Sequence, residues 1–336
     1  MIHLAFISYI SLFSQLFILL TPEIHHNTYE IFGRAQGTTY TVKYIYSKPV
    51  VNKHAIDSIF DVMDQNFSIY RPNSLINSFN SASRYIIATN HLQSLISEAS
   101  FVSTITRGAF DITTLPLSLI WGKFNPKPII APDQKQIEGI LAYSGYQNIY
   151  FNNDSLIKKF PLLKLDSDGI AQGYTVDVIA DYLFTLGIKD FLVEVGGEIR
   201  TNGFNSNKKP WIVGYIAADN YNLYDVASSQ LAISGMSVST SGRLSKFSNT
   251  NIGRKSHIID PRIGKTVENN IISVTVLSHK CVITDAFDNG LMVLGLDSAF
   301  KLCNILPDMG IHIVYKSDSG VIRDTSNAFF KKYLLK

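Results

Sequence analysis

Strand-like and helix-like segments alternate along most of the chain, and this alternation is the strongest constraint on its fold. The clearest case is the β-branched run "IISVTVL" (residues 271–277), which leads within a few residues into the helical pattern "VITDAFDNGLMVLG" (residues 282–295). Alternation of this kind is typical of a mixed α/β domain. Since we find no repeat, low-complexity tract or clear linker, the sequence predicts one mixed α/β unit (an α+β mixed sheet) with two lobes.

The other elements follow from hydrophobic periodicity and from the positions of glycine and proline. Strands are predicted at residues 38–47, 162–166, 191–195, 211–217, 238–241, 256–259 and 311–315, the last of which closes the sheet. Helices are predicted at residues 54–65, 91–106, 133–143 and 167–187. The stretch 114–128 is interrupted by prolines and is predicted as a loop-rich connection.

The first 26 residues differ from the rest of the chain. Leu4–Leu20 has no charged residue, and its 17 residues are at the lower end of the length of a membrane-spanning helix. The first Arg or Lys is Arg34, and no small-residue cleavage pattern or cysteine follows the apolar run. We therefore predict an export signal or uncleaved membrane anchor at residues 1–26, followed by a catalytic domain at residues 27–336 on the periplasmic side of the inner membrane.

Composition and missing motifs exclude several classes of protein. A net charge of +3 without a cluster of Lys or Arg argues against nucleic-acid binding. Cys281 and Cys303 are the only cysteines, which excludes a disulfide scaffold and a cysteine-based zinc site. G-x-G-x-x-G and H-E-x-x-H do not occur, "GMSVS" fails the G-x-S-x-G pattern, and "GKT" lacks the first glycine of a phosphate loop. The common hydrolase, kinase and zinc-protease classes lose their support.

The start of the helix at residues 282–295 carries an unusual group of polar side chains. Asp285, Asp288 and Asn289 are three and four residues apart, so in a helix they can share one face. In one interpretation, Thr284 is the N-cap and the acids of the first turn interact with the helix dipole. In the other, these side chains hold a hard cation.

Four further segments concentrate glycine and polar residues at element boundaries, where sites are usually built. They are "GAFDIT" (108–113), "LDSDGIAQGY" (165–174), "VGGEIR" (195–200) and "SHIIDPRIGK" (256–265). Each alone is consistent with an ordinary turn or helix cap. Together with the helix start they form an ordered series.

This series resembles the ApbE family, the flavin transferases that use FAD to flavinylate proteins. The similarity runs from about Gly33 to the end of the chain and includes seven segments in order: "GRAQGTTYTVKY", "FSIYRPNSLINSFN", "GAFDITTLPLSLIWG", "LDSDGIAQGYTVD", "VEVGGEIRTNG", "SHIIDPRIGK" and "TDAFDNGLMVLG". The resemblance implies an ApbE/T-fold-like structure with a single catalytic domain. It also favours the cation interpretation of the helix start.

The resemblance further implies roles for individual residues. Mg²⁺ would be held by Asp285, by Asp288 or Asn289, and by the carbonyl of Gly169. His257 would be the general base, a role that suits imidazole near neutral pH, and Asp260 would orient it or cap the following turn. The residues implied in FAD binding are Gln36, Tyr70, Ala109, Phe110, Asp111, Asp166, Gln172 and Ile258. For the side chain of Phe110, core packing is an equal alternative.

The reaction implied is a phosphoryl-type transfer. A Thr or Ser hydroxyl of a partner protein, expected to be a membrane redox protein, attacks the FMN phosphorus of FAD, and AMP leaves. The chain departs from the family pattern at Gln36 or its neighbour, where a methionine is common, at Gln172, where a lysine is usual, and at Asn289, where a threonine is expected. These departures keep two alternatives open: a protein that binds FAD without transfer, and an FAD pyrophosphatase that releases FMN and AMP.

Overall fold

The computed structural model describes residues 26–125, 131–217, 229–242 and 258–335. The apolar segment Leu4–Leu20 and the predicted base His257 lie outside these residues, so their predictions stay predictions. Among the helices that are described, none is both long enough and apolar enough to cross a membrane.

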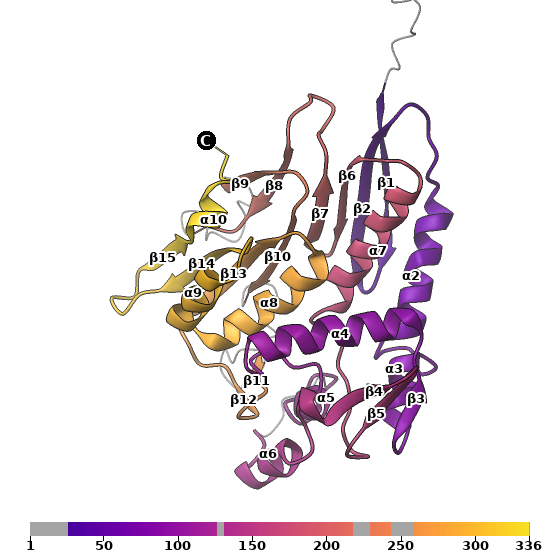
Figure 1. Ribbon diagram of the computed structural model, residues 1–336. Coiled ribbons are helices and arrows are strands. Elements are labelled where there is room, and N and C mark those ends of the chain that lie inside the picture. The colour runs from indigo at the N-terminus through magenta and orange to yellow at the C-terminus, as the bar shows by residue number, and fades with distance from the viewer. Residues whose placement is uncertain (1–25, 126–130, 218–228, 243–257, 336) are drawn as a thin grey trace, which may run out of the picture.

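An eight-stranded antiparallel sheet is the centre of the fold (Figure 1). Its strands, in spatial order, are β1 (Asn27–Ala35), β2 (Thr38–Tyr46), β6 (Asp190–Val195), β7 (Glu198–Asn202), β10 (Ser237–Gly242), β13 (Ile271–Ser278), β14 (Gly310–Lys316) and β15 (Ile322–Ser326). Buried and less buried side chains alternate along β6, whereas β13 is buried on both faces. Both faces of the central strands are therefore covered.

The sheet consists of two similar halves that meet where β7 pairs with β10. In the first half, helix α7 (Ala171–Thr185) lies between β2 and the β6–β7 hairpin in the chain. In the second, helices α8 (Cys281–Leu294) and α9 (Leu296–Ile305) lie between β13 and the β14–β15 hairpin. Helices α7 and α8 pack against each other and against the same face of the sheet. The two segments "LDSDGIAQGY" and "TDAFDNG" thereby become neighbours.

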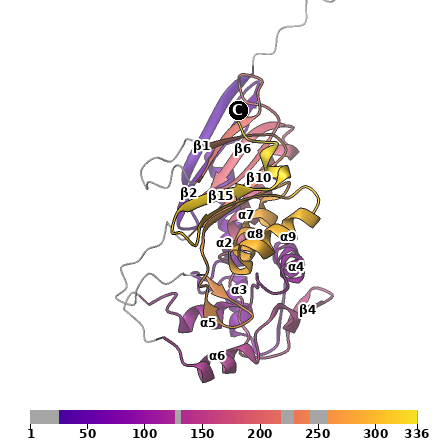
Figure 2. The ribbon, with the colours of Figure 1, turned by 90° about the vertical axis from the view of Figure 1, so that its left-hand side faces the viewer.

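Further elements cover the two faces. Helices α2 (Lys53–Phe67) and α4 (Asn90–Ile105) pack on α7 and α8, and Figure 2 shows α4, α8 and α9 together on one side of the sheet. The opposite face is covered by the hairpin of β8 (Trp211–Tyr215) and β9 (Ser229–Ile233) and by helix α10 (Ala328–Lys331).

A smaller region lies at the other end of the molecule from the start of β1 (Figure 1). Its elements are α3 (Leu75–Ser81), β3 (Tyr85–Ile87), α5 (Leu115–Ile120), α6 (Gln134–Leu141), the 3₁₀ turn η1 (Tyr146–Asn148), β4 (Ile149–Asn152) and β5 (Ser155–Lys158). Strands β3, β5 and β4 form a three-stranded antiparallel sheet. The short strands β11 (Ile259–Asp260) and β12 (Lys265–Thr266) pair with each other.

Several predictions of secondary structure differ from the structure. The helix predicted at 167–187 begins at Ala171, and in the described part of the strand predicted at 256–259 only Ile259 lies in a strand. Residues 162–166 form no strand, because the buried side chain of Asn80 hydrogen-bonds both backbone groups of Leu165. It donates to the carbonyl at 3.0 Å and accepts from the N–H at 2.7 Å. The proline-rich stretch 114–128 contains the short helix α5, in which Pro116 occupies the first turn, where a missing N–H is tolerated. The run at 311–315 is β14, but β15 lies outside it at the edge of the sheet.

The buried Lys158 gives a test of this smaller region. Its ammonium group donates to the carbonyls of Phe79 and Leu163, each at 3.0 Å, and burial lowers its pKa to about 8. In the unfolded chain lysine has a pKa near 10.4, so between these values the unfolded state binds more protons and the free energy of unfolding rises with pH. We expect Lys158→Met to lose more stability relative to wild type at pH 9.5 than at pH 7. Urea titrations at both pH values measure this difference.

The exposed Lys135 on α6 provides the control for that experiment. Lys135→Met should leave the stability difference from wild type the same at both pH values. An equal loss at both pH values for Lys158→Met would contradict the prediction.

Candidate active site

Helix α8 begins four residues earlier than the N-cap interpretation requires. Its first residue is Cys281 and its N-cap is Lys280. Thr284 lies inside the first turn, where its hydroxyl donates to the carbonyl of Cys281 at 3.0 Å. Asp285 and Asp288 therefore lie beyond the first turn. The interpretation of Thr284 as the N-cap of this helix, with the acids in its first turn, is wrong.

The two helices α7 and α8 instead cap each other. Asp177 of α7 accepts from the N–H groups of Cys281 (3.0 Å) and Val282 (2.9 Å), the first two residues of α8. Asp285 of α8 accepts at 2.8 Å from the N–H of Gly173 in the first turn of α7. The N-cap residues of these helices, which are described, make no side-chain cap of their own. Each helix start thus depends on a carboxylate from the other helix, which satisfies N–H groups that a helix cannot pair itself.

Two acidic side chains of α8 are almost completely buried. Burial raises the pKa of Asp285 to about 7, and the pKa of Asp288 is raised well above its usual range by burial and then by the charges of Asp285 and Glu198. One oxygen of Asp288, Oδ1, is buried without a hydrogen-bond partner among the described residues. A nearby cation would stabilise the ionised form of both carboxyl groups.

Asn289, which lies on α8, contacts the segment that carries the predicted backbone ligand Gly169. Its Nδ2 donates to the carbonyl of Asp285 at 2.9 Å, and its Oδ1 accepts from the hydroxyl of Ser241 at 3.3 Å. A Cβ atom added at Gly169 would lie 3.2 Å from Nδ2 of Asn289 and 3.6 Å from the ring of Phe110. The backbone of Gly169 therefore lies directly against the helix that carries Asp285 and Asn289.

These donors are suited to Mg²⁺, which prefers a few hard oxygen ligands and keeps some of its water. Within the described ranges, no three His, Cys, Asp or Glu side chains group in a way that could hold a metal. The candidate ligands therefore stay those that the resemblance implies: Asp285, Asp288 or Asn289, and the carbonyl of Gly169. The orphaned oxygen of Asp288 and the mutual destabilisation of the two carboxylates are the observations that fit a cation here.

The segment 109–111 packs beneath this site. Ala109 and Phe110 are buried, and a Cβ added at Gly290 of α8 would lie 3.1 Å from Cβ of Phe110. Core packing of the Phe110 side chain is therefore confirmed. Asp111 accepts from the N–H and hydroxyl of Thr113, each at 2.7 Å, and from the N–H of Tyr146 at 2.8 Å. These bonds shape the loop; contact of the segment with FAD stays a prediction.

A polar network connects Tyr70 with the segment before α7. The hydroxyl of Tyr70 donates to Asp168 at 2.8 Å, and Lys123 binds both Asp168 (2.8 Å) and Asp166 (2.5 Å). Partial desolvation of its hydroxyl group, and then the charge of Asp168, raises the pKa of Tyr70. The ring of Tyr70 meets that of Phe124 edge to face at 5.5 Å and remains largely exposed. The sequence motifs predicted Tyr70 and Asp166 as FAD-binding residues but did not indicate Lys123 or Asp168.

Gln36 and Gln172 form a separate contact at the turn between β1 and β2. Gln36 adopts a positive φ of 50°, and its side-chain amide donates to the hydroxyl of Thr175 at 3.0 Å. The side-chain amide of Gln172 donates to the backbone carbonyl of Gln36 at 3.4 Å. The Oε1 of Gln36 is buried, with no hydrogen-bond partner in the described part of the chain. The structure thus joins two of the three positions at which the sequence departs from the family pattern.

Ile258 and Asp260 begin the segment that follows His257. The carbonyl of Ile258 accepts from the N–H of Val267 at 2.8 Å. Asp260 accepts from the backbone N–H of Arg262 at 3.0 Å and from its guanidinium at 2.9 and 2.7 Å. Of the two roles expected for Asp260, the described contacts support the capping of the turn.

Comparison with known proteins gives the family. The ApbE family model matches residues 36–313. The chain belongs to the ApbE family. The FAD:protein FMN transferase of Vibrio cholerae is 32% identical over 316 residues, which cover 90% of this chain and 92% of the relative. The predicted family and the predicted enzyme class, a transferase, are confirmed.

Solved ApbE structures have the same fold. The flavin transferase ApbE of Vibrio cholerae matches with a TM-score of 0.81 at 28% identity and covers 92% of this chain and all of that one. The apo flavinyl transferase ApbE of Pseudomonas stutzeri also matches at 0.81, with 30% identity over 92% of this chain and 97% of that chain. The predicted mixed α/β fold of ApbE type is therefore confirmed, while the individual site residues remain predictions.

Proposed function

We propose that this flavin transferase is an Mg²⁺-dependent FAD:protein FMN transferase that attaches FMN through a phosphoester to a Thr or Ser of a partner protein. The observation that carries the proposal is the buried acidic site on α8, where Asn289 lies against the backbone of Gly169, Asp285 is buried one turn away and Asp288 has an oxygen without a partner among the described residues. The names of the relatives support the flavin and the protein acceptor.

In the proposed reaction, the acceptor hydroxyl oxygen forms a bond to the FMN phosphorus while the bond from that phosphorus to the bridging diphosphate oxygen breaks. AMP leaves with the bonding electrons, and His257 accepts the hydroxyl proton. Asp285, Asp288 or Asn289, and the Gly169 carbonyl would hold the ion. Bound Mg²⁺ supplies positive charge that stabilises the negative charge on the departing AMP.

The residues of this chain also have to bind FAD and exclude water. Tyr70 offers an exposed aromatic face on which an isoalloxazine ring can stack. Lys123 supplies positive charge beside the carboxylates of Asp166 and Asp168. We extend the proposal to an exported protein that acts on a membrane redox partner; the charge-free segment Leu4–Leu20 supports the export.

The deciding experiment combines purified protein, FAD, Mg²⁺ and a peptide with a candidate acceptor threonine. Intact mass spectrometry detects FMN on the peptide, and chromatography follows AMP. Flavinylated peptide that disappears with a chelator supports the proposal. AMP and FMN without an adduct would identify an FAD pyrophosphatase instead. Bound FAD without AMP, across several acceptor sequences, would identify a flavin-binding protein.

We expect Lys123→Met to weaken FAD binding. The substitution leaves Asp166 and Asp168 without the cation they share, next to an anionic substrate. The loss of one charge-assisted contact should raise the Kd for FAD by about tenfold. Titration of flavin fluorescence measures the Kd. Lys123→Arg, which keeps the charge, should stay close to wild type, and an unchanged Kd for Lys123→Met would contradict the prediction.

A further inference from the structure

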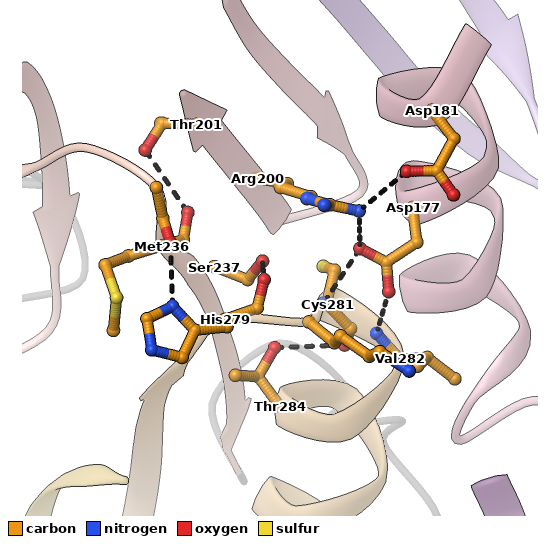
Figure 3. Close-up of polar contacts among 12 residues, drawn as sticks. Asp177, Asp181, Arg200, Thr201, Met236, Ser237, His279, Cys281, Val282 and Thr284 are labelled. Carbon is orange, nitrogen blue, oxygen red and sulfur yellow. Dashed lines mark hydrogen bonds and ion pairs between the residues drawn. The ribbon is translucent and has the colours of Figure 1, made fainter. Parts of the chain in front are cut away.

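Asp177 pairs the first two N–H groups of α8, while Thr284 of the same turn bonds the hydroxyl of Ser239 at 2.8 Å. The loop before the helix is held separately: Nδ1 of His279 contacts the carbonyl of Gly235 at 3.0 Å, and Lys280 pairs with Glu98 at 2.8 Å. Neither contact involves the N–H groups at the helix start. Figure 3 shows Asp177 between Arg200 and these N–H groups, with one carboxylate oxygen directed to Cys281 and the other to Val282.

Arg200 of β7 holds Asp177 in this orientation. Its guanidinium donates to Oδ1 of Asp177 at 2.8 Å and more weakly to Asp181 at 3.4 Å. The side chains of Arg200 and Asp177 are 19% and 12% exposed, whereas that of Asp181 is 70% exposed. Glu198 lies two residues before Arg200 on the same strand, so both side chains point to the helix-bearing face. The segment "VGGEIR" has no role in the proposed reaction, but through Arg200 it contacts Asp177, the residue that caps α8.

These hydrogen bonds form a continuous network that includes the candidate metal ligand Asp285. Arg200 fixes Asp177, Asp177 fixes the start of α8, and Asp285 lies one turn further along that helix. Asp285 in turn accepts from Gly173 in the first turn of α7, the helix on which Asp177 lies. Gly173 follows Gly169 by four residues. A shift at the start of α8 would therefore displace Asp285 and loosen the segment that carries the Gly169 carbonyl.

We propose that Asp177, oriented by Arg200, is a positioning residue of this enzyme: it sets the place of the metal-binding side chains of α8 relative to Gly169. The inference rests on the proposed function for its link to transfer. Asp177 would contact neither FAD nor the metal and would act through the helix start. A merely stabilising Asp177 would lower the melting temperature and leave the site unchanged in the protein that remains folded.

The test compares Asp177→Ala, Asp177→Asn and Arg200→Gln with wild type, in the complete protein. Three quantities are measured: the rise in melting temperature on adding Mg²⁺ without FAD, hydrogen exchange at residues 281–285 and at Gly173, and the kcat and KM for FAD in the transfer assay. We expect Asp177→Ala to remove most of the Mg²⁺-induced shift and to speed exchange at both helix starts at least tenfold. It should also lower kcat at least tenfold, with KM for FAD within threefold of wild type.

Asp181→Asn is the matched control, because it removes an acidic partner of the same arginine from the same helix without touching α8. It should keep the Mg²⁺-induced shift and the kcat within twofold of wild type. Asp177→Asn should fall between wild type and alanine, since an amide oxygen can accept one helix N–H but loses the charge that pairs with Arg200. If Asp177→Ala does not fold, Asp177→Asn and Arg200→Gln decide.

The inference is overturned if folded Asp177 and Arg200 variants keep the wild-type Mg²⁺ shift and the wild-type exchange at Gly173. This outcome is separate from a failure of the proposed function. If wild-type protein transfers no FMN but the Asp177 variants lose the Mg²⁺ shift that wild type shows, the positioning role stands and the transferase does not. If wild type transfers FMN and the variants match it in every readout, the proposed function stands and the positioning role falls.

Discussion

Asp285→Asn should lower the rate of FMN transfer by about 100-fold or more, the range seen when one preorganised electrostatic group is removed from an active site. Asparagine has nearly the shape of aspartate, and its oxygen can still accept the N–H of Gly173, now made at 2.8 Å. The fold and the start of α7 should therefore survive. What disappears is the negative charge that would hold Mg²⁺. The rate is measured with the acceptor peptide at saturating FAD and increasing Mg²⁺.

The stability of the same variant separates charge from capping. Without Mg²⁺, Asp285→Asn should be at least as stable as wild type, because it no longer buries a carboxyl group that resists ionisation. Asp285→Ala removes the cap as well and should lose about 0.5–2 kcal/mol. Asp297→Asn, on the exposed first turn of α9, is a control that should leave the rate unchanged and lower stability by about 1 kcal/mol at most. Full activity in Asp285→Asn would contradict the assignment of the metal site.

Elements with local signals could be predicted from the sequence. Helix α6 begins with a capping box of Asp133 and Gln136, and α7 ends where Gly187 adopts a positive φ of 76°. Strand β13 is mostly β-branched or apolar and was predicted within one residue. In each case the residues that determine the boundary lie within a few positions of it.

Boundaries set by distant residues could not be predicted in this way. The start of α8 carries Lys280 at its N-cap, and its capping carboxylate is 104 residues away in Asp177. Residues 162–166 have the pattern of a strand, but Asn80, 85 residues earlier, takes the backbone groups of Leu165. Helix propensity and hydrophobic periodicity depend on neighbouring residues and carry no information about such distant partners.

The candidate site shows the same division. The ordered motifs identified Asp285, Asn289 and Gly169, and the structure brings them together. Lys123 and Asp168 were missed because their ion pair joins loops from different parts of the chain. Arg200 is the last residue of the segment "VGGEIR". Because residues two apart on a strand share a face, its spacing from Glu198 indicates that both side chains face the helices.

Gly173→Ala should destabilise the protein by about 1–2 kcal/mol, although alanine is the better helix former by about 1 kcal/mol. A Cβ atom at this position would lie 2.4 Å from the carbonyl oxygen of Cys281 and 2.7 Å from Cβ of Asp285. Both contacts are with the helix α8 rather than with a flexible side-chain end, so the two helices would have to separate. The N–H of Gly173 would then leave Asp285, and transfer activity should fall together with stability.

Gly139→Ala is the matched substitution in helix α6. Gly139 is exposed, and a Cβ there would meet nothing within 4 Å, so only helix propensity changes and the variant should gain roughly 0.5–1 kcal/mol. Urea unfolding of both variants measures the two changes with opposite signs. If Gly173→Ala instead stabilised the protein as Gly139→Ala does, α7 and α8 could not be in contact at Gly173. The reciprocal capping by Asp177 and Asp285 would lose its geometric basis, because each carboxylate bonds the first turn of the other helix.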